Sequence, residues 1–231
     1  MNAYERLFGR MAGKKVDRIP NMAIVMQFAG RHVGVPYGKM VSDYRVLADC
    51  MQRCQEDFHL DCFWTISDPM REAEGFGSKV VVPEDGVPYA PEPLIKDVSQ
   101  IPQIRAIDPS MGRRMSDRVE GVRLLASRAR GEMPVIGWVE GMFAEVCDLM
   151  GVSEAMMNLY DEPEAMNELM EVCLDQGLRF ARAQVDAGAS MMGVGDAATS
   201  LIGPKLYEEF ALLFQKRLIS GIKAMGVPVK L

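Results

Sequence analysis

The feature that most constrains the fold of this 231-residue chain is an alternation of short apolar runs with longer amphipathic segments. The short runs have the length of buried strands, and apolar residues in the longer segments recur at i, i+3 and i+4, as in helices. Strands joined by helical connections form βαβ units in a parallel sheet. The expected strands cover residues 22–28, 62–66, 134–139, 189–194 and 227–231.

Signals for the starts and ends of helices support the same alternation. Ser42 can cap a helix that runs to about residue 59. Asp161 and Pro163 begin another helix, which Gly188 ends. The expected helices cover residues 2–12, 42–59, 112–131, 143–150, 161–187 and 205–225. Residues 71–110 are rich in proline, with a short apolar run at 79–83, so we expect an irregular insertion within a single domain over 1–231.

Composition excludes several classes of protein. Hydrophobic residues make up 48% and charged residues 25% of the chain, as in an ordinary globular domain. The net charge of −6 argues against a nucleic-acid partner, which requires a basic surface. No apolar run approaches the roughly 18 residues of a membrane span, and the start of the chain lacks the apolar core of a signal peptide. We therefore expect a cytoplasmic protein, with its five cysteines reduced.

Carboxylates follow three of the expected strands. Asp68 comes after the run at 62–66, Glu140 directly follows Val139, and Asp196 comes after the run at 189–194. In barrels of alternating strands and helices, and in open parallel sheets, the chemistry lies where the strands end. Converging carboxylates can act as general acids or bases. The alternative is structural: each carboxylate caps the next helix or pairs with an arginine.

Gly30, Arg31 and His32 follow the first expected strand. An arginine at a strand end can bind a carboxylate or phosphate through two parallel hydrogen bonds, and its position favours this role over the alternative of a surface salt bridge. A dinucleotide site is not indicated, because the segment from Gly193 to Asp196 lacks the third glycine of that fingerprint.

A zinc site built from cysteines is also not indicated. Cys50, Cys54, His59 and Cys62 are close in sequence, but Cys50 and Cys54 lie at i and i+4 on the apolar face of an expected helix. Buried cysteine behaves as a small hydrophobic residue, and zinc sites favour shorter paired spacings.

Several fragments, taken in order, resemble the uroporphyrinogen decarboxylase superfamily. Residues 5–20 are similar to its opening, residues 26–32 to its M-R-Q-A-G-R-Y loop, and residues 67–68 to the S-D after its second strand. Residues 139–151 resemble the V-E-G-P-F-T-L-A-A-D-L-R-G segment of its corrinoid-dependent methyltransferase branch, and residues 195–210 the G-D…S-P-x-x-Y-E-E-F segment. The resemblance implies an α/β fold of the TIM (β/α)8-barrel type.

Departures from the decarboxylase pattern favour the methyltransferase branch. The decarboxylase uses two arginines of its first loop to bind substrate carboxylates, and Gln27 replaces the first of them while Arg31 keeps the second. Asp148 falls near the position of a decarboxylase tyrosine, and Ala197 near that of a serine. A neutral amide cannot replace a guanidinium facing a carboxylate.

The resemblance implies a methyltransferase that moves a methyl group between a small substrate and the cobalamin-type corrinoid of a partner protein. Methoxy-aromatic, methylamine, thiol and folate substrates all fit. In this branch zinc activates the substrate. Its ligands are an H-x-C-G motif after the fifth strand and a later cysteine, and Leu231 precedes the position of that motif. We therefore expect no metal ligand within residues 1–231, zinc only in a full-length parent, and a barrel truncated after about four to five strands.

The resemblance also implies roles for six residues. The catalytic candidates are Asp68, Glu140 and Asp196, and the substrate-binding candidates are Gln27, Arg31 and His32. A homodimer is compatible with the resemblance. The first alternative function is decarboxylation of a porphyrinogen in porphyrin biosynthesis. The second is an inactive fragment or a binding module, because an unclosed parallel barrel exposes strand edges.

Overall fold

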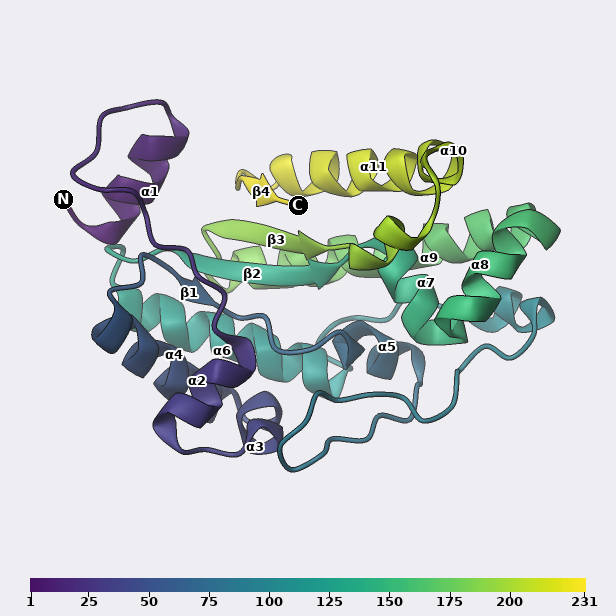
Figure 1. Ribbon diagram of the computed structural model, residues 1–231, viewed down its shortest axis with the longest axis horizontal. Helices are drawn as coiled ribbons and strands as arrows, with labels where there is room; N and C mark the ends of the chain where they lie inside the picture. The colour runs from purple at the N-terminus through teal and green to yellow at the C-terminus, as the bar shows by residue number, and fades with distance from the viewer.

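The computed structural model describes residues 1–231 and consists of a short parallel sheet with helices around it (Figure 1). The strands are β1 (Phe63–Trp64), β2 (Val135–Glu140), β3 (Met191–Gly195) and β4 (Val229–Lys230). The helices are α1 (Ala3–Met11), α2 (Met26–Val33), α3 (Tyr37–Ser42), α4 (Tyr44–Phe58), α5 (Met70–Phe76), α6 (Arg113–Ala129), α7 (Met142–Met150), α8 (Val152–Asp161), α9 (Pro163–Asp186), α10 (Pro204–Leu206) and α11 (Leu212–Lys223). No helix is long and apolar enough to cross a membrane.

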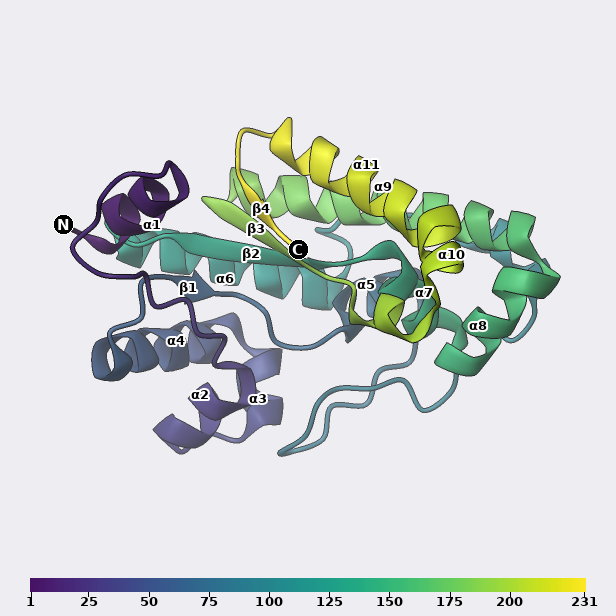
Figure 2. The ribbon, with the colours of Figure 1, turned by 45° about the horizontal axis from the view of Figure 1, so that its top comes forward.

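The four strands pair in chain order, β1-β2-β3-β4, and every pair is parallel. β2 and β3 form the longest ladder, which runs from Ile136 opposite Met191 to Glu140 opposite Gly195. Long helices connect the strands: α6 precedes β2, α9 precedes β3 and α11 precedes β4. Figure 2 shows α6, α9 and α11 running alongside the sheet. The chain therefore folds as the βαβ units that its alternating pattern predicts.

Alternate residues of the strands pack into two separate apolar clusters. Val135 and Val139 of β2 belong to the large cluster shared with the surrounding helices. Ile136 lies in a smaller cluster with Trp64 and Met191, and Trp138 packs against it. Because successive strand side chains point to opposite faces, Glu140 lies on the same face as Ile136 and Trp138.

The prediction of a strand over residues 22–28 is wrong. The chain is irregular up to Val25, and α2 then begins at Met26. Apolar residues at Met26, Ala29 and Val33 have helical spacing, and α2 packs against α4. The run therefore satisfies its backbone within a helix instead of in a ladder beside β1. The small strand expected at 79–83 is reduced to one bridge between Val81 and Tyr89.

Other boundaries differ by a few residues. Asp43, rather than Ser42, caps α4, since its carboxylate accepts a hydrogen bond from the amide of Arg45 at 2.8 Å. The segment expected as one helix over 205–225 contains α10, a π-helical turn over Tyr207–Ala211 and then α11. Residues 71–110 contain the end of α5, a 3₁₀ turn at Val98–Gln103 and otherwise irregular chain.

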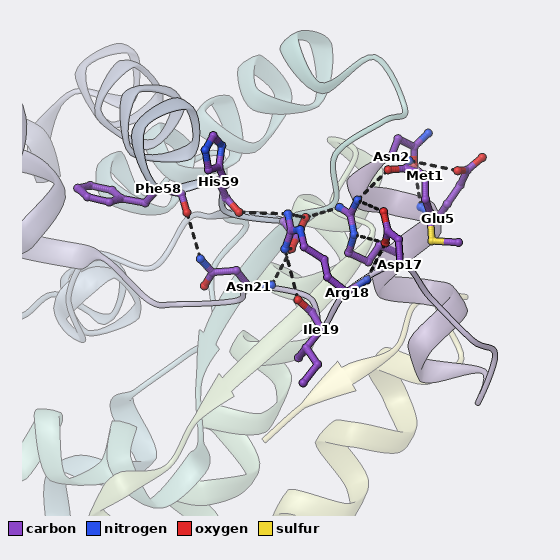
Figure 3. Close-up of polar contacts among 11 residues, drawn as sticks. Met1, Asn2, Glu5, Asp17, Arg18, Ile19, Asn21, Phe58 and His59 are labelled. Atoms are coloured by element: carbon purple, nitrogen blue, oxygen red, sulfur yellow. Dashed lines mark hydrogen bonds and ion pairs between the residues drawn. The ribbon is translucent and has the colours of Figure 1, made fainter.

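An ion-pair network ties the N-terminal segment to the strand β1 side of the molecule (Figure 3). We call Arg6, Asp17, Arg18 and Asp61 the N-terminal network. Arg6 contacts Asp61 at 2.6 Å and Asp17 at 2.7 Å, and Arg18 contacts Asp61 at 2.5 Å. The backbone amide of Asn21 donates a further bond to Asp61 at 2.6 Å. Asp61 is only 1% exposed, so this network fixes the path of the chain into α2.

Candidate functional site

A pocket of about 350 Å³ lies at the carboxyl ends of β1, β2 and β3. Asp68, Glu140 and Asp148 line it together with the indole of Trp138 and apolar side chains. A larger hollow of about 640 Å³ is lined by residues such as Phe63 and Glu132, next to the amino ends of β1 and β2. The chemistry of parallel barrels is found at the carboxyl ends, so we assign the candidate site to the smaller pocket.

Two glycines of β3 allow Trp138 to form one wall of this pocket. A Cβ atom on Gly193 would lie 2.4 Å from the indole of Trp138, and one on Gly195 would lie 2.7 Å from it. Both distances are far below van der Waals contact, so the indole can lie against β3 only because these positions have no side chain. The ring is also fixed by an edge-on contact with Trp64, at 6.0 Å between ring centroids.

Asp68 is buried, and its carboxylate is fully engaged. One oxygen accepts hydrogen bonds from the Ser67 hydroxyl at 2.7 Å and from Arg114. The other accepts a hydrogen bond from the amide of Met70 at 3.1 Å, at the start of α5. Asp68 therefore lines the pocket and also performs the structural roles that we set beside the catalytic one, capping a helix and pairing with an arginine.

Glu140 is held at the end of β2 by two donors. Its Oε1 accepts hydrogen bonds from the indole N–H of Trp138 at 3.0 Å and from Arg71 at 3.2 Å. The side chain is 10% exposed, and burial raises its pKa to about 8, although Arg71 acts in the opposite direction. Near neutral pH this carboxyl group carries a proton, so it can donate one as a general acid.

Asp196 lies directly behind the pocket wall. Its Oδ1 accepts a hydrogen bond from the amide of Ala144 in the first turn of α7 at 2.9 Å, and its Oδ2 accepts one from Gln215 at 2.8 Å. The Asp196 side chain packs against Gly141. A Cβ atom on Gly141 would lie 2.3 Å from the Cβ of Asp196, so a larger residue at position 141 would clash. The structure thus brings Asp68 and Glu140 to one pocket and places Asp196 behind it, joining β3 to α7.

The three substrate-binding candidates lie on α2, outside the pocket. Gln27 donates a hydrogen bond to the carbonyl oxygen of Asp85 at 3.4 Å, and the exposed guanidinium of Arg31 is 3.5 Å from the Asp85 carboxylate. The His32 ring is 2.7 Å from the Asp57 carboxylate and stacks on Phe28. Only Met26, at the start of α2, lines the pocket. These positions follow from the formation of a helix where a strand was expected.

Glu140 belongs to a group of four acids beside the pocket, and sequence reasoning did not assign a role to the other three. We call Glu72, Glu140, Glu145 and Asp148 the acidic cluster. Glu72 accepts a hydrogen bond from the amide of Glu140 at 3.0 Å. Glu145 is 2% exposed and neither of its carboxyl oxygens has a hydrogen-bond partner. Burial raises its pKa well above the usual value, and neighbouring acids raise it further.

Asp148, like Glu140, is a member of the cluster that lines the pocket. Burial raises its pKa to about 8, with Glu72 and Asp68 adding to the effect. Three buried arginines, Arg71, Arg114 and Arg118, lie behind the acids and do not line the pocket. The available sequence signal was the spacing of Glu145 and Asp148, three residues apart on a helix that follows a strand end.

Residues 1–231 do not fit a zinc ion. No group of three or more His, Cys, Asp or Glu side chains is arranged to hold a metal. All five cysteines are free and buried, and burial raises the pKa of Cys50 to about 11 and of Cys147 to about 12. Because the thiolate is the metal ligand, such thiols are poor candidates. Cys50 and Cys54 are core residues of α4, as their spacing predicted.

Comparison with known proteins identifies the family. The family model of uroporphyrinogen decarboxylase (URO-D) matches residues 2–231. The chain belongs to the uroporphyrinogen decarboxylase family. Within this family, a methylcobamide:CoM methyltransferase MtbA from Methanosarcina acetivorans is 23% identical over 229 residues, and one from Methanosarcina mazei is 24% identical. Both alignments cover 96% of this chain and 67% of the relative.

Decarboxylases of the family are similar over 60% to 95% of this chain. A uroporphyrinogen decarboxylase from Nocardia farcinica is 32% identical over 165 residues, which cover 68% of this chain and 44% of the relative. Among solved structures, a methyltransferase from Methanosarcina mazei superposes with a TM-score of 0.86 at 17% identity, over 96% of this chain and 67% of that one. These findings confirm the resemblance and the barrel-type α/β fold.

Proposed function

We propose that this member of the family transfers a methyl group between a small methylated substrate and a corrinoid carried by a partner protein. The relatives named methylcobamide:CoM methyltransferase, similar over 96% of the chain, are compatible with this function, although a decarboxylase of the family is similar over 95% of it. The pocket supports this function independently. Its volume of about 350 Å³ suits a small ligand, and eight of its 13 lining residues are hydrophobic.

The observation that most supports methyl transfer is the composition of the pocket lining. It contains no lysine, arginine or histidine, and it contains three carboxyl groups. A porphyrinogen carries several carboxylates, and each would require a cationic or strongly donating partner. In this pocket it would meet Asp68, Glu140 and Asp148 instead. The charge of the lining therefore favours methyl transfer over decarboxylation of a tetrapyrrole.

The chain's own residues suggest how methyl transfer would be assisted. Trp138 and the apolar lining would orient the methyl group and exclude water. Glu140, fixed by Arg71 and Trp138, holds a proton near neutral pH. A heteroatom that loses a methyl group gains electron density, and a positioned acid can transfer a proton to it. Asp68 would hold α5, and with it Arg71, against the pocket.

Zinc has no assigned step in this proposal. Where present in a methyltransferase site, it supplies Lewis acidity that stabilises an anionic thiol or alkoxide. The histidine and cysteine side chains of residues 1–231 do not form a set of ligands for it. In our proposal any such zinc is bound by residues outside this range, as the sequence resemblance implies.

The test is methyl transfer to and from free corrinoid. We expect the chain to convert cob(I)alamin to methylcob(III)alamin in the presence of a methylated donor under anaerobic conditions, followed by absorbance, with the demethylated product identified by NMR. Trimethylamine, methoxybenzene and dimethyl sulfide would serve as donors. We expect Glu140→Gln to reduce the rate about 10²-fold or more with an oxygen or sulfur donor.

Two results would contradict the proposal. One is conversion of uroporphyrinogen to coproporphyrinogen, detected by chromatography, without any methyl transfer. The other is the absence of both activities in folded protein, which would favour a binding module. Glu154→Gln is the matched control, because Glu154 lies on α8 in an exposed position outside the pocket.

A further inference from the structure

The charges around the pocket are unbalanced. Six acids are buried or half-buried at this end of the sheet, while the three nearby arginines already face carboxylates. Arg114 pairs with Asp68, Arg71 lies 3.2 Å from Glu140 and Arg118 lies 3.7 Å from Asp117. The acids are Asp68, Glu72, Glu140, Glu145, Asp148 and Asp196. The arginines lie behind the acids, so the pocket side of the arrangement is acidic.

Oxygen atoms without partners face the pocket. Glu140 is a nine-tenths buried side chain whose Oε1 is bonded to Trp138 and Arg71, while its Oε2 accepts no hydrogen bond. That Oε2 lies on the β3 side, 3.0 Å from where a Cβ on Gly195 would stand. Asp148, three residues after Glu145 on α7, lines the pocket without a hydrogen bond or an ion pair. The lining contains no lysine, arginine or histidine that could pair with these carboxyl groups, so the pocket favours a ligand that carries positive charge.

The indole of Trp138 provides the second recognition element. The ring rests on β3 at Gly193 and Gly195, and Trp138 is one of the residues that line the pocket. The π-face of an indole attracts cations, and methylated ammonium groups are the ligands that such surfaces bind best, because their methyl groups are apolar while the charge is retained. The apolar side chains Met26 and Val152 complete a lining suited to methyl groups.

We infer that the pocket binds a small organic cation that carries methyl groups on nitrogen or sulfur, held between the Trp138 indole and the carboxyl groups of Glu140 and Asp148. This inference rests on the proposed function for its reaction, and names the substrate class for it. A metal cation fits poorly, since no three acids converge on one point. An anionic thiol or a folate would find no lysine, arginine or histidine in the lining to pair with its negative charge.

The methyl-transfer step balances for this substrate class. When a quaternary nitrogen gives up a methyl cation to the reduced corrinoid, the electron pair of the broken carbon–nitrogen bond stays on nitrogen. The product is a tertiary amine, and its nitrogen can then take up the proton that Glu140 holds near neutral pH.

The test is binding of a matched pair of ligands to the intact chain, measured by calorimetry. Choline and 3,3-dimethylbutan-1-ol have the same shape, but only choline is charged. We expect choline to bind at least about tenfold more tightly, as cation–π and carboxylate contacts require. Equal binding of the two ligands, or tighter binding of 2-mercaptoethanesulfonate than of choline, would overturn the inference.

Variants separate the contributions of the two recognition elements. Asp148→Asn keeps the shape of a side chain that makes no hydrogen bond, so it is expected to fold and to weaken choline binding about threefold to tenfold without changing binding of the neutral ligand. Trp138→Phe is expected to weaken choline binding by a similar factor. Asp161→Asn, at an exposed position of α8, is the matched control and should leave binding unchanged. If both Asp148→Asn and Trp138→Phe bound choline as tightly as the unmodified chain, the inference would be contradicted.

The pH dependence gives an independent readout, because the charge of choline is fixed. Ionised carboxylates bind a cation better than neutral ones, so affinity should rise as the pH passes through 8, where Glu140 and Asp148 ionise. The charged and titratable groups that influence these two are Asp68, Arg71, Glu72 and Glu145. An affinity independent of pH between 6 and 9 would count against these carboxyls as the contact.

The outcomes distinguish this inference from the proposed function. If choline binds selectively but no methyl transfer to or from corrinoid occurs, the cation site stands and the proposed function fails. If methyl transfer proceeds from dimethyl sulfide or methoxybenzene while choline does not bind, the function stands and the cationic substrate class fails.

Discussion

The N-terminal network and the acidic cluster are two groups of charged side chains. They differ in how completely their oxygen atoms are paired with donors. In the network, Asp61 accepts hydrogen bonds on both oxygens, from Arg6, Arg18 and the amide of Asn21. In the cluster, both oxygens of Glu145 have no hydrogen-bond partner, and Oε2 of Glu72 has only an ion-pair contact with Arg71 at 3.7 Å. The network joins α1 and the following loop to the chain before β1 (Figure 3), whereas the cluster borders the pocket.

The difference separates structural charges from candidate functional ones. Opposite charges in the network stabilise the ionised forms, and the hydrogen bond from Arg6 lowers the pKa of Asp17. Excess acid in the cluster favours the protonated forms, and burial raises the pKa of Glu140 and of Asp148 to about 8. Groups with strongly shifted pKa values in a pocket are where acid–base chemistry or charged ligands are found.

The largest expected effect is removal of the central acid of the network. Asp61→Ala leaves the guanidinium of Arg6, whose side chain is 9% exposed, without its buried partner. Breaking a buried ion pair in this way typically costs about 3–5 kcal/mol of stability. Urea denaturation at pH 7 would measure the loss.

The control for this variant is Asp175→Ala. Asp175 contacts Arg179 through two bonds of 2.9 Å, but both side chains are about half exposed, so the loss should stay below about 1 kcal/mol. If Asp61→Ala cost no more than Asp175→Ala, the N-terminal network would not be a stabilising feature of the fold.

The next expected effect is an opposite pH dependence of the two regions. Between about pH 4 and pH 8 the unfolded chain has already released the protons of Glu140 and Asp148, whereas the folded chain retains them. Their contribution to stability is therefore present below the unfolded pKa and declines as the pH rises to 8, by about 1.4 kcal/mol per pH unit for each carboxyl group that stays protonated. Asp17 contributes in the other direction: its stabilisation is present above its unfolded pKa and is lost on acidification.

Denaturation at several pH values tests this difference. The double variant Glu140→Gln/Asp148→Asn should flatten the decline between pH 5 and pH 8 while leaving the loss at acidic pH unchanged. A decline of the same slope in the double variant would show that other groups cause it.

The smallest expected effect is that of Glu145→Gln. Burial raises the pKa of this carboxyl well above its usual value and favours the neutral form, so an amide replaces a group of the same shape that has no hydrogen-bond partner. The change in free energy of unfolding should remain within about 1 kcal/mol. The isosteric change Asp61→Asn in the network should cost several times more, because it removes a charge that two arginines face. A large loss in Glu145→Gln would show that this residue is ionised and paired.

The sequence predicted more of the architecture than of the site. Helical connections of the right length predicted the parallel sheet, and Gly188 was correctly placed at the end of α9, in a positive-φ conformation that favours glycine. The run at 22–28 misled because apolar residues at Met26, Ala29 and Val33 fit a helix as well as a strand. Arg31 and His32 were thereby assigned to a strand end, although they lie on the outer side of α2.

Prediction of the site was limited by the same cause. Strand-end position was a sufficient signal for Asp68 and Glu140, which reach one pocket. It could not distinguish Asp196, whose carboxylate is turned to Ala144 and Gln215. Arg71 and Glu145 gave no signal by themselves, because only packing shows which helical charges face the interior.

By itself, the sequence determined the positions of β1 to β4, the long helices between them, the parallel sheet and the family, since these depend on local spacing and on ordered fragments along the chain. Only the tertiary structure decided which carboxyl groups share a pocket, which are paired and which remain protonated. Those properties depend on burial and on distances between residues far apart in sequence, such as Arg71 and Glu140 at 3.2 Å. Ionisation responds to surroundings that are complete only when α5, α7 and the strand ends have come together.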